Sequence, residues 1–162
     1  MANSIITGSA AASTAFATGH KTTVRFLGLG PRTDDLLTGF EPTAEPFASV
    51  ASILEAAKKR VRSTGIAVTC RVTHATPAGF ACHIEDRGWD NDITEHMVDN
   101  NIDVVFGGGF RHLIPSGTSY TTSFGAVWKG KLVRIIMGFY LSALNQKWAA
   151  CHNQFDITFL AK

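Results

Sequence analysis

Two junctions between an expected strand and an expected helix carry side chains that could take part in chemistry. Ser9 follows a short apolar run at residues 4–7 and begins a helical stretch, where unpaired backbone N–H groups favour an anion. Thr76 begins a second helix, and Arg87 lies near its end. Arginine can hold a phosphate with two parallel N–H bonds. The pattern indicates an anion site, although Ser9 could serve only as a helix cap and Arg87 as a solvated cation.

Strands and helices are expected to alternate over residues 1–115. Residues 9–18 are rich in alanine and precede Gly19, a pattern typical of a helix that ends in glycine. Residues 28–46 are rich in glycine and proline and predict an exposed loop. The apolar spacing from residue 47 predicts an amphipathic helix that ends before Gly65. The other expected elements are a strand at 4–7, a strand at 66–72, a helix at 76–86, a helix at 92–100 and a strand at 102–106.

Strands separated by helices predict an α/β fold, namely a three-layer α/β/α sandwich with a mostly parallel sheet. In such folds, sites form at the carboxyl ends of the strands. The periodicity fades after Pro115. We therefore treat residues 1–115 and 116–162 as separate regions.

Composition supports one globular domain: the chain has 162 residues, of which 45% are hydrophobic. The net charge of +2 is uneven, because residues 1–115 hold 10 basic and 12 acidic residues and residues 116–162 hold five and one. Five dispersed bases do not form the dense run that binds nucleic acid, so no nucleic-acid or membrane partner is expected. No transmembrane segment or signal peptide is recognised, and three widely spaced cysteines predict neither a disulfide framework nor a zinc knuckle.

Three motifs, in order, resemble the alkaline phosphatase family. Residues 7–11 read TGSAA and residues 14–22 read TAFATGHKT, similar to the family's nucleophile motif TDSAA followed by TAxATGxKT. Residues 73–78 read THATPA and are continued by His83 and Arg87, similar to the segment that leads to the family's phosphate-binding arginine. Residues 101–109 read NIDVVFGGG, similar to IDVxxGGG. The resemblance covers about residues 1–124 and implies a fragment of the alkaline phosphatase fold.

The resemblance implies a role for each matching residue. Ser9 would attack phosphorus and become transiently phosphorylated, and Arg87 would hold two phosphate oxygens. Thr76 would be a ligand in the magnesium site, and His74 takes a neighbouring position where members have aspartate or histidine. Zn and Mg are the family's cofactors, and a small-molecule phosphomonoester is the implied substrate. A homodimer and a periplasmic or secreted location are also implied.

The chain departs from the family at two points. Gly8 replaces the aspartate that helps to orient the arginine. The family's zinc ligands lie upstream and far downstream, and the late candidates His152 and Asp156 do not resemble them, so zinc ligands are expected to be absent from this chain and only part of the magnesium site present. Cys82 and His83 are expected in a packed core.

Two functional hypotheses follow. Residues 1–115 would form a partial alkaline-phosphatase-like domain that hydrolyses phosphomonoesters through a phosphoserine intermediate, as an incomplete segment of the full enzyme. The alternative is a catalytically inactive truncated remnant. A sulfatase or phosphodiesterase is disfavoured by the THATPA segment. Residues 116–162 are expected to be a divergent or frame-shifted tail.

Overall fold

The structure is a computed structural model that describes residues 1–34, 36–114, 116–121, 127–129 and 158–161. His152, Asp156 and most of the predicted tail lie outside these described residues. The elements in chain order are α1 (Ser9–Thr18), α2 (Ile53–Lys59), β1 (Gly65–Arg71), α3 (Ala75–Ala78), α4 (Asp90–Asp99), β2 (Val104–Gly108), the 3-10 helix η1 (Phe110–His112), β3 (Ser119–Thr121), β4 (Val127–Lys129) and β5 (Thr158–Ala161).

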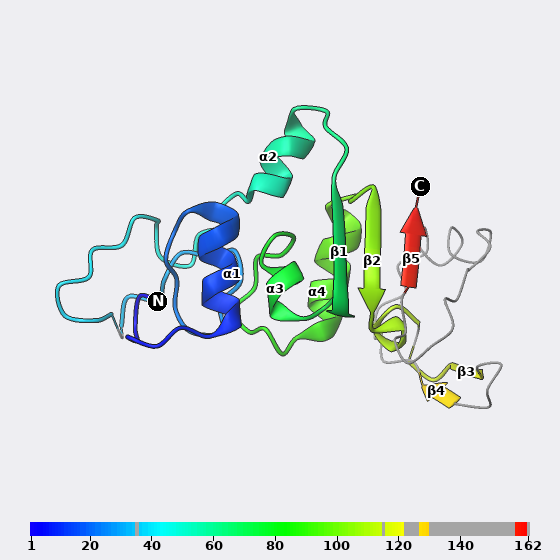
Figure 1. The fold of residues 1–162 in the computed structure, drawn as a ribbon. Coiled ribbons are helices and arrows are strands. Elements are labelled where there is room, and N and C mark those ends of the chain that lie inside the picture. Colours follow the sequence, from blue (N-terminus) through cyan, green and yellow to red (C-terminus); the bar gives the residue numbers. More distant parts are fainter. Residues whose placement is uncertain (35, 115, 122–126, 130–157, 162) are drawn as a thin grey trace.

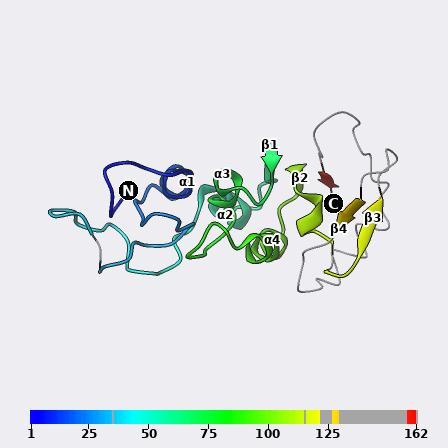
Figure 2. The same cartoon turned by 90° about the horizontal axis from the view of Figure 1, so that it is seen from below.

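The central sheet has the order β1-β2-β5 (Figure 1). β1 and β2 are parallel, with Gly65 opposite Val104, and the chain between them forms α3 and α4. β5 pairs antiparallel with the other side of β2, where Leu160 lies opposite Val105. Helix α4 lies on one side of these strands (Figure 2), and β3 and β4 form a separate antiparallel pair. Parallel strands joined through helices confirm the predicted α/β class.

The hydrophobic core lies between the helices and β1 and β2. It is built from apolar side chains that are at most 9% exposed. Its larger aliphatic members are Leu27, Leu54, Ile66, Val72, Ile84, Ile93, Met97, Ile102 and Val105. Because Leu27 and Ile84 belong to this core, the chain segments on either side of them are anchored to it.

Helix α1 has the limits that its sequence predicts. It begins at Ser9 after Gly8, and it ends at Gly19, whose φ of 79° lies in the left-handed region. The Gly19 N–H donates to the Ala15 carbonyl at 2.9 Å, which satisfies one of the last carbonyls of the helix. The alanine-rich sequence favours this helix because alanine loses no side-chain entropy.

Helix α1 packs closely against α3 because residue 79 has no side chain. A Cβ atom on Gly79 would lie 2.2 Å from Ser13 Oγ and 2.7 Å from Ser13 Cβ. Ser13 Oγ donates to the Ala75 carbonyl at 2.8 Å across this contact. Helix α1 is therefore fixed against the chain that follows β1.

The predicted strand at residues 4–7 is wrong. These residues form bends and coil, and Ile5 and Ile6 are 91% and 75% exposed. A short strand needs a neighbouring strand to accept its backbone hydrogen bonds. Among the described residues, this segment is instead attached through Ala2, whose N–H donates to Thr22 O, and through Asn3, whose side chain accepts from the Val24 N–H.

The predicted helix after residue 47 is confirmed in type but is shorter, since α2 covers only Ile53–Lys59. Ser52 accepts a hydrogen bond from the Glu55 N–H, while the Glu55 carboxylate accepts from the Ser52 N–H. This capping box fixes the start of the helix. Val50 belongs to the preceding extended chain, and its N–H donates to the Gly28 carbonyl.

The predicted helix at 76–86 is also too long, since α3 ends at Ala78. The Gly79 contact with Ser13 and the pairing of Ile84 with Leu27 hold the following chain in turns and extended structure. The helix at 92–100 and the strands at 66–72 and 102–106 are confirmed as α4, β1 and β2, with ends displaced by up to two residues.

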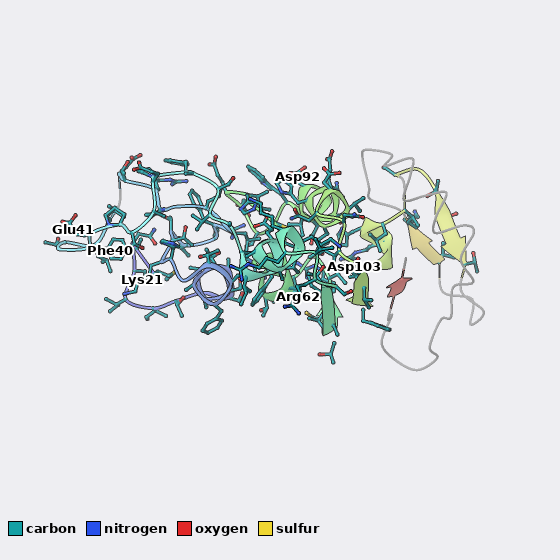
Figure 3. All side chains as sticks on the ribbon, turned by 90° about the horizontal axis from the view of Figure 1, so that it is seen from above. Lys21, Phe40, Glu41, Arg62, Asp92 and Asp103 are labelled. Atoms are coloured by element: carbon teal, nitrogen blue, oxygen red, sulfur yellow. The ribbon has the colours of Figure 1, made fainter. Side chains whose placement is uncertain are left out.

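The loop predicted at 28–46 is confirmed as irregular chain that projects beyond α1, away from the sheet (Figure 1). Its predicted exposure is wrong for residues 28–31, which are buried, because Leu29 pairs with Ser49. Figure 3 shows Lys21 and Phe40 close together at this end, where the Lys21 ammonium lies 5.9 Å from the centre of the Phe40 ring. No helix in the described part of the chain is long and apolar enough to cross a membrane.

We predict that Gly79→Ala destabilises the protein by about 1–3 kcal/mol, because the added methyl group must displace Ser13. Ser13→Ala alone loses the hydrogen bond to Ala75. The double variant should lose less unfolding free energy than the two single variants together, since Ser13 Oγ is the atom nearest to the added methyl group. Urea unfolding of the three variants measures this, and additive losses would contradict the packing described.

Candidate active site

The side chains of Ser9, His74 and Arg87 meet at one place. Arg87 Nη1 donates a hydrogen bond to Ser9 Oγ, and Arg87 Nη2 lies 3.3 Å from His74 Nε2. All three residues are half-buried. Three of the four predicted site residues, which are far apart in sequence, are thus brought together by the fold.

Ser9 and His74 are placed by the starts of two helices. Ser9 is the first residue of α1, where backbone N–H groups have no partner within the helix. His74 immediately precedes α3, and its N–H donates to the Arg71 carbonyl at the end of β1. Since α1 packs on α3 through Ser13 and Gly79, the two helix starts are held together.

Arg87 is placed by backbone pairing with residues 25–27. Leu27 and Ile84 exchange two hydrogen bonds of 2.9 Å, and the Arg87 N–H donates to the Arg25 carbonyl at 3.0 Å. Leu27 and Ile84 are buried in the core. The backbone of Arg87 is therefore fixed relative to the chain that follows α1.

The neighbouring carboxylates are paired with other arginines. Asp86 forms an ion pair with Arg25 at 2.6 Å, and Asp90 forms one with Arg71 at 3.0 Å. Within the part of the chain that the structure describes, no carboxylate lies within ion-pair distance of the Arg87 guanidinium. Its charge is available to an anion, and the start of α1 adds a second favourable field.

The surroundings of His74 favour its neutral form. Burial lowers the pKa of His74, and the positive charges of Arg87 and then Arg71 lower it further, against an opposing effect of Asp90. A neutral imidazole can accept a hydrogen bond at Nε2, where Arg87 is the donor. His74 therefore supports Arg87 without competing with it for an anion.

Thr76 lies in the first turn of α3 and is exposed. Charges of both signs act on His74, from Arg87 and Arg71 and, in the opposite direction, from Asp90. Among the described residues, no group of three His, Cys, Asp or Glu side chains lies close enough together to hold a metal ion. His74 and Thr76 therefore do not form a metal site with the described residues alone.

The prediction for Cys82 is confirmed, because Cys82 is 1% exposed in the core. His83 is instead a half-buried connecting residue: Nδ1 lies 2.7 Å from the Gly28 carbonyl and Nε2 lies 2.7 Å from Glu55 Oε1. Both partners are acceptors, so both contacts are satisfied when both ring nitrogens carry protons. His83 therefore connects the start of the 28–46 loop with helix α2 through these two contacts.

Arg25 and Asp86 lie beside the site and were missed from the sequence. They are 61 positions apart, and no motif connects them. Arg25 also has a φ of 74°, a conformation that its residue type does not predict. The adjacent charged pair Asp86-Arg87 was the only sequence signal near them.

The fold and these contacts define an α/β protein in which a serine at a helix start accepts a hydrogen bond from an arginine that has no carboxylate partner among the described residues. The family model "Alkaline phosphatase" matches residues 1–135, which extends into the region after residue 115. The chain belongs to the alkaline phosphatase family.

Curated relatives agree with this family. An alkaline phosphatase of Schizosaccharomyces pombe is 37% identical over 121 residues, which cover 72% of this chain and 20% of the relative. Alkaline phosphatase 4 of Bacillus subtilis is 33% identical over 143 residues, which cover 78% of this chain and 28% of the relative. The chain thus spans between a fifth and a third of the length of these relatives.

Solved structures agree as well. The alkaline phosphatase of the Antarctic bacterium TAB5 superposes with a TM-score of 0.56 at 32% identity, covering 67% of this chain and 28% of that one. A histidine-to-aspartate variant of the TAB5 enzyme is described with Mg bound in its M3 site. The alkaline phosphatase of a Shewanella species gives a TM-score of 0.57 at 34% identity, with 67% and 24% coverage.

We predict that Arg87→Gln raises the pKa of His74, because a positive charge that disfavours the imidazolium is removed. The pKa should stay below its ordinary value, since burial is the largest cause of the shift. A proton NMR titration with chelator present measures this. Arg62→Gln, at an exposed arginine after α2 (Figure 3), is the control and should leave His74 unchanged.

We predict that Gly8→Asp stabilises the protein by about 0.5 kcal/mol, because aspartate caps a helix better than glycine and its charge favours the start of α1. Gly8 has φ −95° and ψ 166°, and a Cβ there meets nothing within 4 Å. Urea unfolding of Gly8→Asp and Gly8→Asn separates the charge effect from capping. A loss of stability in both variants would contradict the prediction.

Proposed function

We propose that this segment carries the nucleophile and the phosphate-binding arginine of a phosphomonoesterase that works through a phosphoserine intermediate. The observation that carries this proposal is the hydrogen bond from Arg87 to Ser9, made by a guanidinium with no carboxylate partner among the described residues. A small-molecule phosphomonoester is the proposed substrate. The proposal includes a homodimer and an exported location for the longer protein.

The proposed reaction has two displacements at phosphorus. The Ser9 hydroxyl loses its proton to solvent and Oγ forms a bond to phosphorus while the bond from phosphorus to the ester oxygen breaks, and the leaving oxygen takes a proton from solvent to become the alcohol. Water then attacks the phosphoserine, which breaks the bond to Ser9 Oγ and releases inorganic phosphate.

Arg87 would act in both displacements. Its positive charge stabilises the alkoxide form of Ser9, and its paired N–H groups can hold two oxygens of the phosphoryl group. The free N–H groups at the start of α1 add to this attraction.

Zn and Mg are proposed as cofactors of the longer protein because the chain belongs to this family, of which one solved member is described with bound Mg. His74 and Thr76 mark the proposed magnesium region. The described residues do not supply a complete ligand set. We therefore assign no step of the reaction to a metal.

A second candidate is a catalytically inactive remnant of such an enzyme. It is favoured by the lack of a three-ligand cluster among the described residues. The two candidates differ in turnover but share the phosphate site.

We predict that the 162-residue chain binds inorganic phosphate weakly and that Arg87→Ala weakens this binding about ten-fold or more, because charge-assisted hydrogen bonds are lost. Titration with phosphate, followed by backbone amide NMR, measures the affinity and should shift the signals of Ser9 and its neighbours. Arg62→Ala is the control and should bind as the unaltered chain does. Equal affinity after Arg87→Ala would contradict the site.

The same samples test whether this chain turns over a substrate by itself. Turnover of an aryl phosphate at alkaline pH with added zinc and magnesium, lost with a chelator and in Ser9→Ala, would favour the enzyme. Negligible turnover of the isolated chain is the expected result.

A further inference from the structure

Arg25 and Asp86 accept hydrogen bonds from the backbone at and beside Arg87. The Arg25 guanidinium donates two hydrogen bonds to the Asp86 carboxylate, from Nε to Oδ2 at 2.9 Å and from Nη2 to Oδ1 at 2.6 Å. The Arg25 carbonyl accepts the hydrogen bond from the Arg87 N–H. Asp86 Oδ1 also accepts from the Gly88 N–H at 2.7 Å. The Asp86 carboxylate thus connects Arg25 with Gly88, the residue that follows Arg87.

The ion pair contributes orientation more than stability. The Arg25 and Asp86 side chains are 56% and 29% exposed, and exposed ion pairs contribute little to the free energy of unfolding. Two parallel hydrogen bonds do fix the relative orientation of their groups. The pKa of Asp86 lies below its ordinary value, chiefly because of the hydrogen bonds from Arg25, which keeps the carboxylate ionised.

The backbone of Arg25 has an unusual conformation at this contact. Its φ of 74° lies in the left-handed region that side chains other than glycine rarely adopt. An unfavourable backbone conformation persists only where surrounding contacts hold it. At residue 25 those contacts are the bonds to Asp86 and to the Arg87 N–H.

We propose that Arg25 and Asp86 are positioning residues that orient the Arg87 guanidinium toward Ser9 and an incoming phosphoryl group. This inference rests on the proposed function of Arg87. Arg25 cancels the charge of Asp86, which would otherwise attract the Arg87 guanidinium away from the anion.

The test compares inorganic phosphate affinity in variants that keep the net charge. Arg25→Gln with Asp86→Asn deletes the ion pair without changing net charge, and we expect about five-fold weaker phosphate binding. In an Arg87→Ala background the same two substitutions should change the phosphate affinity by less than about two-fold. Equal losses in both backgrounds would show that the pair does not act through Arg87, and would overturn the proposal.

Asp86→Asn alone gives opposite expectations for two mechanisms. Removing a negative charge near the site strengthens phosphate binding if only electrostatics matters. Loss of positioning weakens it. Tighter binding by Asp86→Asn, together with unaltered binding by the charge-neutral pair, would overturn the proposal.

Matched variants control for folding and for the deletion of an ion pair. Arg25→Gly keeps the left-handed backbone at no steric cost and should still weaken phosphate binding. Lys58→Gln with Asp103→Asn deletes a 2.7 Å ion pair near the start of β1, whereas the site follows the end of β1; Asp103 is seen in Figure 3. This control pair should leave phosphate affinity unchanged, and an equal loss there would count against a specific role.

A second readout needs no phosphate. The Nε–Hε NMR signal of Arg87 reports how rigidly its side chain is held, and deleting the Arg25–Asp86 pair should increase its mobility. Unchanged rigidity with unchanged phosphate affinity would overturn the positioning role and leave the proposed function intact. Loss of rigidity in a chain whose phosphate affinity is insensitive to Arg87→Ala would instead show the proposed function to be wrong.

Discussion

The approach of α1 to the chain after β1 is the constraint on which the site depends. It exists because Gly79 leaves room for Ser13, and because Ser13 then reaches the Ala75 carbonyl. The start of α1 carries Ser9, and the residue before α3 is His74. A Cβ atom at residue 79 would lie 2.2 Å from Ser13 Oγ, so Ser13 would have to shift.

Ion pairing with carboxylates determines which arginine near the site is available to bind an anion. Three arginines lie near the site, yet Arg25 and Arg71 are each paired with an aspartate, at 2.6 Å and 3.0 Å. Arg87 instead contacts the Ser9 hydroxyl and His74, whose surroundings favour the neutral imidazole. Among these three arginines of the described chain, the two local carboxylates therefore pair with Arg25 and Arg71 and leave Arg87 without a carboxylate partner.

The sequence patterns predicted those helices and strands whose limits depend on interactions between residues close in sequence. The limits of α1 follow from its alanines and from Gly19, and the parallel β1 and β2 follow from apolar runs separated by helical segments. The start of α2 could also have been predicted, since Ser52 and Glu55 have the spacing of a capping box. The motifs identified Ser9, His74 and Arg87 through resemblance rather than through spacing.

The errors occur where distant contacts override local preference. The helix predicted at 76–86 stops because Gly79 packs on Ser13 and Ile84 pairs with Leu27. Three of the residues at 4–7 are β-branched, but no described strand accepts their hydrogen bonds. The ion pair of Arg25 and Asp86 depends on a left-handed arginine, which no sequence pattern indicates.

The short helices beside the site have a consequence for its assembly. Helices α2 and α3 have seven and four residues, and helices of this length do not persist in water without tertiary packing. The geometry of Ser9, His74 and Arg87 therefore exists only after the core has closed around Leu27 and Ile84. An anion that binds there selects the folded chain over the unfolded one, so ligand concentration and folding equilibrium are thermodynamically linked.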